Sequence, residues 1–255
     1  MTTSTKLGDN ALLDTALSIL LQTTNLVNKL SEKSITTPAS LEVGASSGLW
    51  TAHDPELESA RSAVLGLTQK LDMLLHGPHG FLHEYVSTNW EHGALYTLLE
   101  FHILDKIPLP DAHVDNSGKS ASVTAEQLAV GTGLTTEKLL RVCRLAACVG
   151  ILKETSEGSF AHTAISEELV RDKGFRAWVE FQLYETRVAS ANLADSLKRP
   201  DTNPNNFWTG QPAFDYAWGK PMYTWHREHP EKGKRFAQAM QSVAQCKLRF
   251  LSWPV

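Results

Sequence analysis

Apolar residues recur at helical spacing along most of the chain. Between residues 9 and 33 they form one stripe, which predicts a helix: Leu12, Leu13, Ala16, Ile19, Leu20, Val27 and Leu30. A second helix is predicted from Pro55 to about Leu75, because proline is favoured in a first helical turn. The segment HGPHG at 76–80 is expected to break it. The following stretch predicts one or two helices that end before Pro108 and Pro110.

Residues 123–165 predict a compact unit of two helices and a β-hairpin. The first helix begins with a capping box, in which Thr124 is the N-cap and Gln127 stands three residues later. The second helix, TTEKLLRVCRLAACVG, ends at Gly150, and two strands are predicted over 151–154 and 159–163. This order is typical of a winged helix.

The last third of the chain predicts a helix over about 175–198 and a closing helix from about Pro230 to Arg249. Between them lies an aromatic segment, FWTGQPAFDYAWGKPMYTWH, which contains Phe207, Trp208, Phe214, Tyr216, Trp218, Tyr223 and Trp225. Such a density of rings is compatible with an ordinary core. It would equally suit the wall of a pocket for a flat aromatic or polyketide ligand.

Composition and charge narrow the classes of protein. The chain has 255 residues, of which 42% are hydrophobic and 20% charged, so one or two folded domains are expected. The formal net charge of −4 offers no general attraction to nucleic acid or an anionic membrane. Three cysteines form no disulfide framework, and no signal peptide or membrane span is recognisable. We therefore expect a cytoplasmic protein without a membrane partner.

The motifs that could carry chemistry predict no catalytic residue. Lys138, Arg141 and Arg144 lie three residues apart on one helical face, as in a DNA-recognition helix. Glu154 and Glu157 in the wing oppose phosphate binding, so no nucleic-acid partner is expected.

Two further motifs suggest a nucleotide or a metal, and each has a plainer interpretation. LEVGASSGLW at 41–50 is similar to a nucleotide-binding glycine loop, but Pro38 before it argues against a buried strand, and a linker is favoured. His76, His79 and His83 lack a completing cysteine or carboxylate cluster, so no metal site is predicted.

Three segments in this order carry a family resemblance: VTAEQLAVGTGLTTEKLLRVCRLAACVGILKE, then AFDYAWGKPMY, then HPEKGKRFAQAM. Over residues 9–255 the chain resembles the N-terminal half of fungal class I O-methyltransferases of natural-product pathways, the group that includes sterigmatocystin-type enzymes. The resemblance implies a homodimer built by the N-terminal helices and a winged helix that does not read DNA. It also implies that the RFAQAM helix lines a pocket for the methyl acceptor.

On that basis the residues expected to bind a hydrophobic aromatic or polyketide substrate are Trp178, Phe214, Phe236 and Met240. In the family a later Rossmann-like domain binds S-adenosylmethionine and supplies the catalytic base. Because the sequence ends at FLSWPV, we expect no cofactor and no catalytic residue in this chain.

The resulting prediction of fold class is a mainly α protein. It has a helical dimerisation segment (1–110), a winged helix with a small β-hairpin wing (111–170) and a pocket-lining segment (171–255), and its Rossmann-like domain is absent. The functional prediction is a truncated O-methyltransferase relative that does not methylate alone. Two alternatives stay open: a binding or cyclising protein that does not use S-adenosylmethionine, and a winged-helix DNA-binding regulator.

Overall fold

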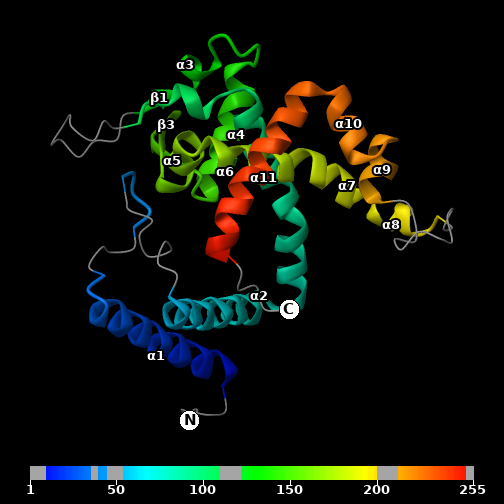
Figure 1. Cartoon of the computed structure of the whole chain (residues 1–255). Helices are drawn as coiled ribbons and strands as arrows, with labels where there is room; N and C mark the ends of the chain where they lie inside the picture. Colours follow the sequence, from blue (N-terminus) through cyan, green and yellow to red (C-terminus); the bar gives the residue numbers. More distant parts are fainter. Residues whose placement is uncertain (1–9, 36–39, 45–53, 110–121, 200–211, 251–255) are drawn as a thin grey trace. The chain divides into compact units, whose positions relative to one another are not determined.

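A computed structural model describes residues 10–35, 40–44, 54–109, 122–199 and 212–250, with side chains as far as Ala244 (Figure 1). The described residues form two compact units. The first comprises residues up to 40 together with 54–89, and the second comprises residues 41–44 and 90–247. Phe207, Trp208, most of the glycine loop at 41–50, the Cys246 side chain and the closing residues 251–255 lie outside the described part.

The first unit is a pair of helices, α1 (Ala11–Glu32) and the beginning of α2 (Pro55–Glu100), which lie side by side (Figure 1). Asn10 caps α1 by accepting hydrogen bonds from the backbone of Leu12 and Leu13. Lys33 bonds to Asp54, which joins the end of one helix to the start of the other. The α1 helix predicted over 9–33 is therefore confirmed.

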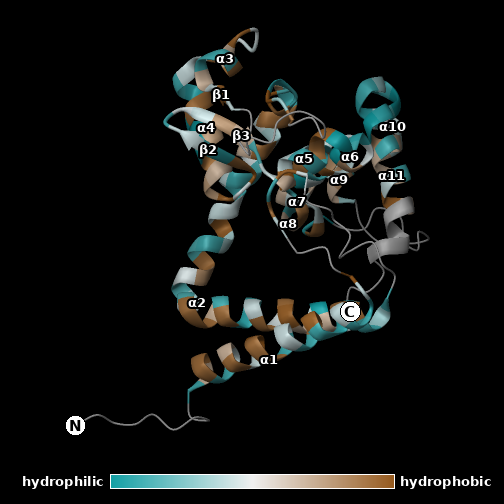
Figure 2. Cartoon of the chain, turned by 90° about the vertical axis from the view of Figure 1, so that its left-hand side faces the viewer, coloured by the Kyte–Doolittle hydropathy of each residue, from teal (hydrophilic) through white to brown (hydrophobic). Residues whose placement is uncertain are grey.

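The apolar residues of α1, brown in Figure 2, are largely exposed within this unit. Leu12, Leu13, Leu17, Leu20, Leu21 and Val27 have exposed fractions of 40–67%. Large apolar residues of α2, including Leu65 and Leu75, are exposed in the same way. The described residues of this unit thus leave an extended apolar surface uncovered.

The expected break at HGPHG is a kink within α2. Gly77 takes a non-helical conformation (φ 62°, ψ 176°), after which the helix resumes with Pro78 in its next turn. Only glycine adopts such a positive φ without strain, and proline is tolerated in the first turn that follows. The helix then runs on to Glu100.

The second unit contains a small antiparallel sheet, and helices precede and follow its strands along the chain. After the short η2 turn (Leu104–Lys106) come β1 (Val123–Thr124), α3 (Ala125–Ala129), α4 (Thr136–Cys148), β2 (Leu152–Ser156) and β3 (Ser159–His162). The capping box of Thr124 and Gln127 is confirmed. The predicted hairpin is confirmed as the antiparallel pair of β2 and β3. The sheet has a third strand, which the sequence did not predict, and its strand order is β1-β3-β2. In the additional strand β1, Val123 pairs with Phe160. A strand of two residues is too short to show the alternation of apolar and polar residues that predicts a strand.

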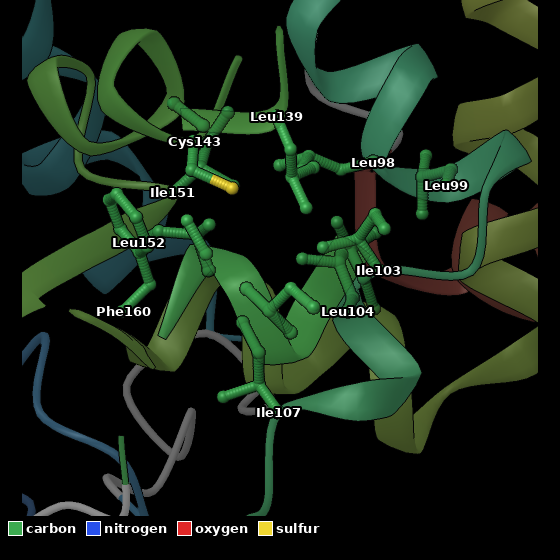
Figure 3. Packing of buried hydrophobic residues seen from close by; sticks show 14 residues of the cluster. Leu98, Leu99, Ile103, Leu104, Ile107, Leu139, Cys143, Ile151, Leu152 and Phe160 are labelled. Atoms are coloured by element: carbon green, nitrogen blue, oxygen red, sulfur yellow. The ribbon is translucent and has the colours of Figure 1, made fainter. Parts of the chain in front are cut away.

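The core of this unit joins α2, α4 and the sheet (Figure 3). Its largest side chains are almost fully buried: Leu98, Leu99, Ile103, Leu104, Leu128, Leu139, Leu152 and Phe160. At about 25 cal/mol per Å2 each such side chain contributes roughly 1.5–3 kcal/mol on burial. Phe175, Val179 and Leu183 also pack against this core, which therefore joins the end of α2 to the segment that leads to the candidate site.

The helix predicted over 175–198 is divided in the structure. After α5 (Ala164–Arg171) come α6 (Lys173–Phe181), the π-helical turn η3 (Gln182–Thr186), α7 (Arg187–Ala191) and α8 (Leu193–Leu197). The aromatic segment forms α9 (Ala213–Trp218) and α10 (Met222–Glu228), and α11 (Pro230–Phe250) closes the described part. A π turn adds a residue to one helical turn and often marks a functional site.

Among the residues described, every helix is either too short or too polar to span a lipid bilayer.

Candidate functional site

Aromatic rings from four helices surround His226. We call Phe181, Phe214, Trp218, Trp225, His226 and Phe236 the aromatic cluster. The His226 ring stacks on Phe236 with centroids 4.6 Å apart and planes at 15°. Its centroid lies 5.9 Å from that of Phe214 and 6.2 Å from that of Phe181. With only 5% of its surface exposed, His226 lies in an environment of rings rather than of water.

Glycines let these helices approach one another. Gly219 ends α9 in the left-handed conformation (φ 72°), and the chain then turns into α10 at Pro221. A Cβ on Gly233 of α11 would lie 2.7 Å from the His226 carbonyl oxygen. A side chain at Gly233 would therefore push α11 away from α10, so glycine is required for this packing.

A buried ion-pair network adjoins the aromatic cluster. Glu185, in the π turn, is fully buried, and its Oε1 accepts a hydrogen bond of 2.5 Å from Arg235 Nη2. Arg235 also lies 3.7 Å from Glu180, which accepts from Arg176 Nε at 2.9 Å. Arg176 Nη1 in turn donates to both carboxylate oxygens of Asp105, at 2.8 Å each. The network ties α6, η3 and α11 together.

Several polar atoms at this junction are buried without a partner among the described residues. They are Glu185 Oε2, Thr186 Oγ1, Trp218 Nε1, both ring nitrogens of His226 and Arg235 Nε. Most buried polar atoms in native proteins make a hydrogen bond, so each exception calls for an explanation. Their concentration on η3, α9, α10 and the start of α11 marks this junction as a candidate ligand site.

Burial lowers the pKa of His226, and the nearby Arg235 charge acts in the same direction. The Glu185 carboxylate opposes this, as does the Met222 carbonyl, whose geometry falls short of a hydrogen bond. The ring is therefore neutral at pH 7 and offers one donor and one acceptor. Burial opposes the charge of Arg235, but Glu185 and Glu180 outweigh it and raise the pKa of the guanidinium.

A pocket of about 510 Å3 borders the network on the side of α6 and α11. Its lining is mostly charged and includes Arg176, Glu180, Lys232, Lys234 and Arg235. Arg235 therefore connects this open pocket with the buried Glu185.

The structure places the four sequence-predicted substrate residues in different surroundings. Trp178 and Phe236 are half-buried and pack against the same small core of Ala177, Phe181 and Ala239. Phe214 is linked to them through His226. Met240 stands at the edge, with 37% of its surface exposed.

Sequence reasoning missed His226, Glu185 and Arg235. Glu185 and Arg235 are 50 positions apart, so no local spacing relates them, and only their packing makes them a pair. One weak signal is present in the sequence, because Glu185 follows Phe181, Leu183 and Tyr184 in a helical segment.

The motifs set aside in the sequence analysis acquire structural partners. Arg144 Nη2 donates to Glu154 Oε1 at 3.0 Å, so one cation of the basic strip is paired with an acid of β2. His76 lies 3.1 Å from an Asp72 carboxylate oxygen. Within the described ranges no group of three or more histidine, cysteine or acidic residues could hold a metal ion.

No family model matches the chain, but it is similar to individual proteins. The chain is 55% identical over 240 residues to the O-methyltransferase phnC of Penicillium herquei, which covers 94% of this chain and 53% of phnC. The crystal structure of OxaC superposes with a TM-score of 0.67 at 16% identity, over 91% of this chain and 50% of OxaC. The mitomycin 7-O-methyltransferase MmcR gives a TM-score of 0.51 at 21% identity, over 73% and 46% of the two chains. The chain thus spans about half the length of these proteins.

These similarities correct the predicted fold class. The prediction defined the class by a missing Rossmann-like domain, whereas the likeness to OxaC extends over 91% of the chain and includes a small sheet with several helices. The error arose because the prediction was based on the closing residues 250–255, whereas the packing of the residues before them sets the fold. The chain is accordingly similar in sequence to a fungal O-methyltransferase, and its described part shares its fold with about half of OxaC.

Proposed function

We propose that the protein takes part in transferring a methyl group from S-adenosylmethionine to a hydroxyl of an aromatic or polyketide-derived compound. The observation that carries this proposal is the 55% identity to the O-methyltransferase phnC over 94% of the chain. OxaC has also been crystallised with S-adenosylhomocysteine and oxaline, and that complex has a similar fold (TM-score 0.61). The grouping with sterigmatocystin-type enzymes stays a prediction.

The described residues supply a wall suited to the methyl acceptor. Phe214, Phe236 and Trp178 are half-buried rings that lie near one another, and a flat aromatic compound that packs on such rings gains both burial and stacking. Met240 lies at the exposed rim of this wall, where a flexible thioether adapts to ligands of different outline. These side chains would orient the acceptor and exclude water from one of its faces.

The described residues do not fit the methyl donor. A site for S-adenosylmethionine needs a buried strand, a glycine turn and a helix N-terminus in succession. The described strands form one antiparallel sheet, Gly131 and Gly133 lie between two helices, and Gly158 lies in a hairpin. Acceptor binding is therefore the contribution that we assign to these residues.

We also propose that the protein forms a homodimer through its first unit. The apolar faces of α1 and the beginning of α2 are exposed there. Exposed apolar patches of this kind are typical of interfaces between protein chains.

Methyl transfer can be tested with the protein expressed from its own gene. It would be incubated with S-adenosylmethionine labelled in the methyl group and a panel of hydroxylated aromatic compounds, and the methyl ethers identified by mass spectrometry. Phe236→Ala should raise KM for the acceptor more than it lowers kcat, since a stacking face is lost. Leu197→Ala, at a 76% exposed position, serves as the control. Tight acceptor binding with no methyl transfer to any hydroxyl would contradict the proposal.

A further inference from the structure

The unpartnered polar atoms of the aromatic cluster form a complementary set. Glu185 Oε2 only accepts hydrogen bonds, Trp218 Nε1 only donates them, and the neutral His226 ring offers one of each. Glu185 is fully buried and His226 is 95% buried, so neither side chain can take a hydrogen-bond partner from bulk water.

These atoms are held in place by the protein rather than free to find partners by moving. Arg235 holds the other oxygen of Glu185 at 2.5 Å. The His226 ring is fixed between Phe236 and Trp225, at centroid distances of 4.6 Å and 5.3 Å. Trp218 is fixed against Trp225 at 4.7 Å. A rigid, unsatisfied set of donors and acceptors is how a binding site is pre-organised.

We infer that Glu185, His226 and Trp218 form a subsite that binds a hydroxyl group of a flat aromatic ligand. The hydroxyl is required because the free oxygen of Glu185 needs a donor, which an ether or a ketone lacks. The same oxygen of the ligand accepts from Trp218 or from His226. The inference deepens the proposed function, on which it rests for the ligand class alone.

The test compares two probes that differ in one group, 2-naphthol and 2-methoxynaphthalene, in the same buffer with a little dimethyl sulfoxide. Dissociation constants come from saturation-transfer NMR titrations of the protein, without any methyl donor. We expect 2-naphthol to bind roughly tenfold more tightly than its ether, because the ether leaves Glu185 and His226 unpaired. Equal affinities would overturn the inference.

Two variants locate the effect. His226→Phe keeps a ring in the stack but removes both nitrogens, so it should abolish most of the preference for 2-naphthol while the ether still binds. Glu185→Gln replaces an acceptor by an amide and should lower or reverse the preference. His229→Phe is the matched control, since His229 lies on the exposed side and its ring stacks on Trp225 at 4.2 Å. It should leave the preference unchanged, and an unchanged preference in His226→Phe would contradict the subsite.

If the variants do not fold, the inference is tested on the wild-type protein by measuring the NMR resonances of its histidine ring nitrogens with each probe. A shift of the His226 ring nitrogens with 2-naphthol but not with the ether supports the subsite. No shift with either probe means that the buried atoms bind water alone, which overturns it. Neither result depends on methyl transfer. The subsite can therefore be disproved while the proposed function stands, and the proposed function can be disproved while the subsite stands.

Discussion

Met240 and Phe236 are one helical turn apart on α11, yet the structure gives them different environments. Phe236 packs against Phe181 at a centroid distance of 5.2 Å, whereas 37% of the Met240 surface is exposed. On the proposed function, Met240 would contribute more to ligand contact than to stability. Substitutions at these two positions can therefore distinguish an effect on folding stability from an effect on ligand binding.

Met240→Ala should cost less than about 1 kcal/mol in the free energy of unfolding, because its site is already partly solvated. A core methionine would instead cost about 2–5 kcal/mol on the same change. The substitution should nonetheless weaken the binding of 2-methoxynaphthalene. Urea unfolding and the NMR titration measure the two effects. A large loss of stability with unchanged binding would end the assignment of Met240 to the pocket wall.

His162 gives the protein a stability that depends on pH. It is 2% exposed, and its ring nitrogens lie 2.9 Å from Ser166 Oγ and 3.1 Å from the Ile107 carbonyl oxygen. Burial lowers its pKa, although the carbonyls of Ile107 and Leu104 and the charges of Glu167 and Asp105 oppose the shift. The pKa of the folded state is thus below the ordinary value of 6.5.

As the pH falls through 6.5, the unfolded chain therefore takes up the proton first. The stabilisation is complete above that value and is lost as the pH falls toward the pKa of the folded state. The buried His226 acts in the same direction. Urea unfolding at pH values from about 7.5 to 5.5 should show decreasing stability, and His162→Gln should flatten part of the slope. Stability that increases on acidification would contradict this account.

At the scale of elements, the close approach of α10 and α11 and the π turn at η3 create the candidate site. The π turn carries Glu185, and the contact between the helices brings Arg235 and His226 near it. The pairing of Glu185 with Arg235 joins residues 50 positions apart in the sequence.

Gly233→Ala should destabilise the protein by about 1–3 kcal/mol, the usual cost of overpacking, because its Cβ would lie 2.7 Å from the His226 carbonyl oxygen. Gly66→Ala is the matched change, since Gly66 is exposed within α2 and a Cβ there meets nothing within 4 Å. That change should stabilise by about 0.5–1 kcal/mol through helix propensity. Thermal unfolding measures both. Equal effects of the same sign would show that α11 can shift without cost.

At the scale of the whole molecule, the exposed apolar residues of the first unit are the strongest indication of an assembly. Leu17 and Leu20 on α1 are 42% and 65% exposed, and Leu65 at the beginning of α2 is 52% exposed. In a monomer these apolar side chains would be in contact with water, which is unfavourable. Burial against a second copy of the chain would remove them from water.

Light scattering at concentrations on the order of tens of micromolar should therefore give the mass of a dimer. The double variant Leu17→Glu and Leu20→Glu should shift it to the monomer, because burying two charges in an apolar interface is costly. Leu197→Glu, at an exposed position of the short helix α8, should remain dimeric. A wild-type protein that is monomeric at these concentrations would contradict the proposed dimer.

Sequence alone predicted the elements whose signals are local. The α1 and α11 helices, the capping box of Thr124 and Gln127 and the hairpin strands follow from periodicity, caps and turns within a few residues of one another. The resemblance carried by three short segments indicated the O-methyltransferase family, and the match to phnC supports it.

Tertiary structure alone decided what depends on distant partners. Only packing shows that the Val123 strand joins the hairpin, that the π turn interrupts the helix expected over 175–198, and that α2 kinks rather than ends at Gly77. Glu185, His226 and Arg235 meet because three helices converge, and no pattern along the chain encodes that meeting. Periodicity records which face of a helix is apolar, but the partner of a buried polar group is fixed by the fold that surrounds it.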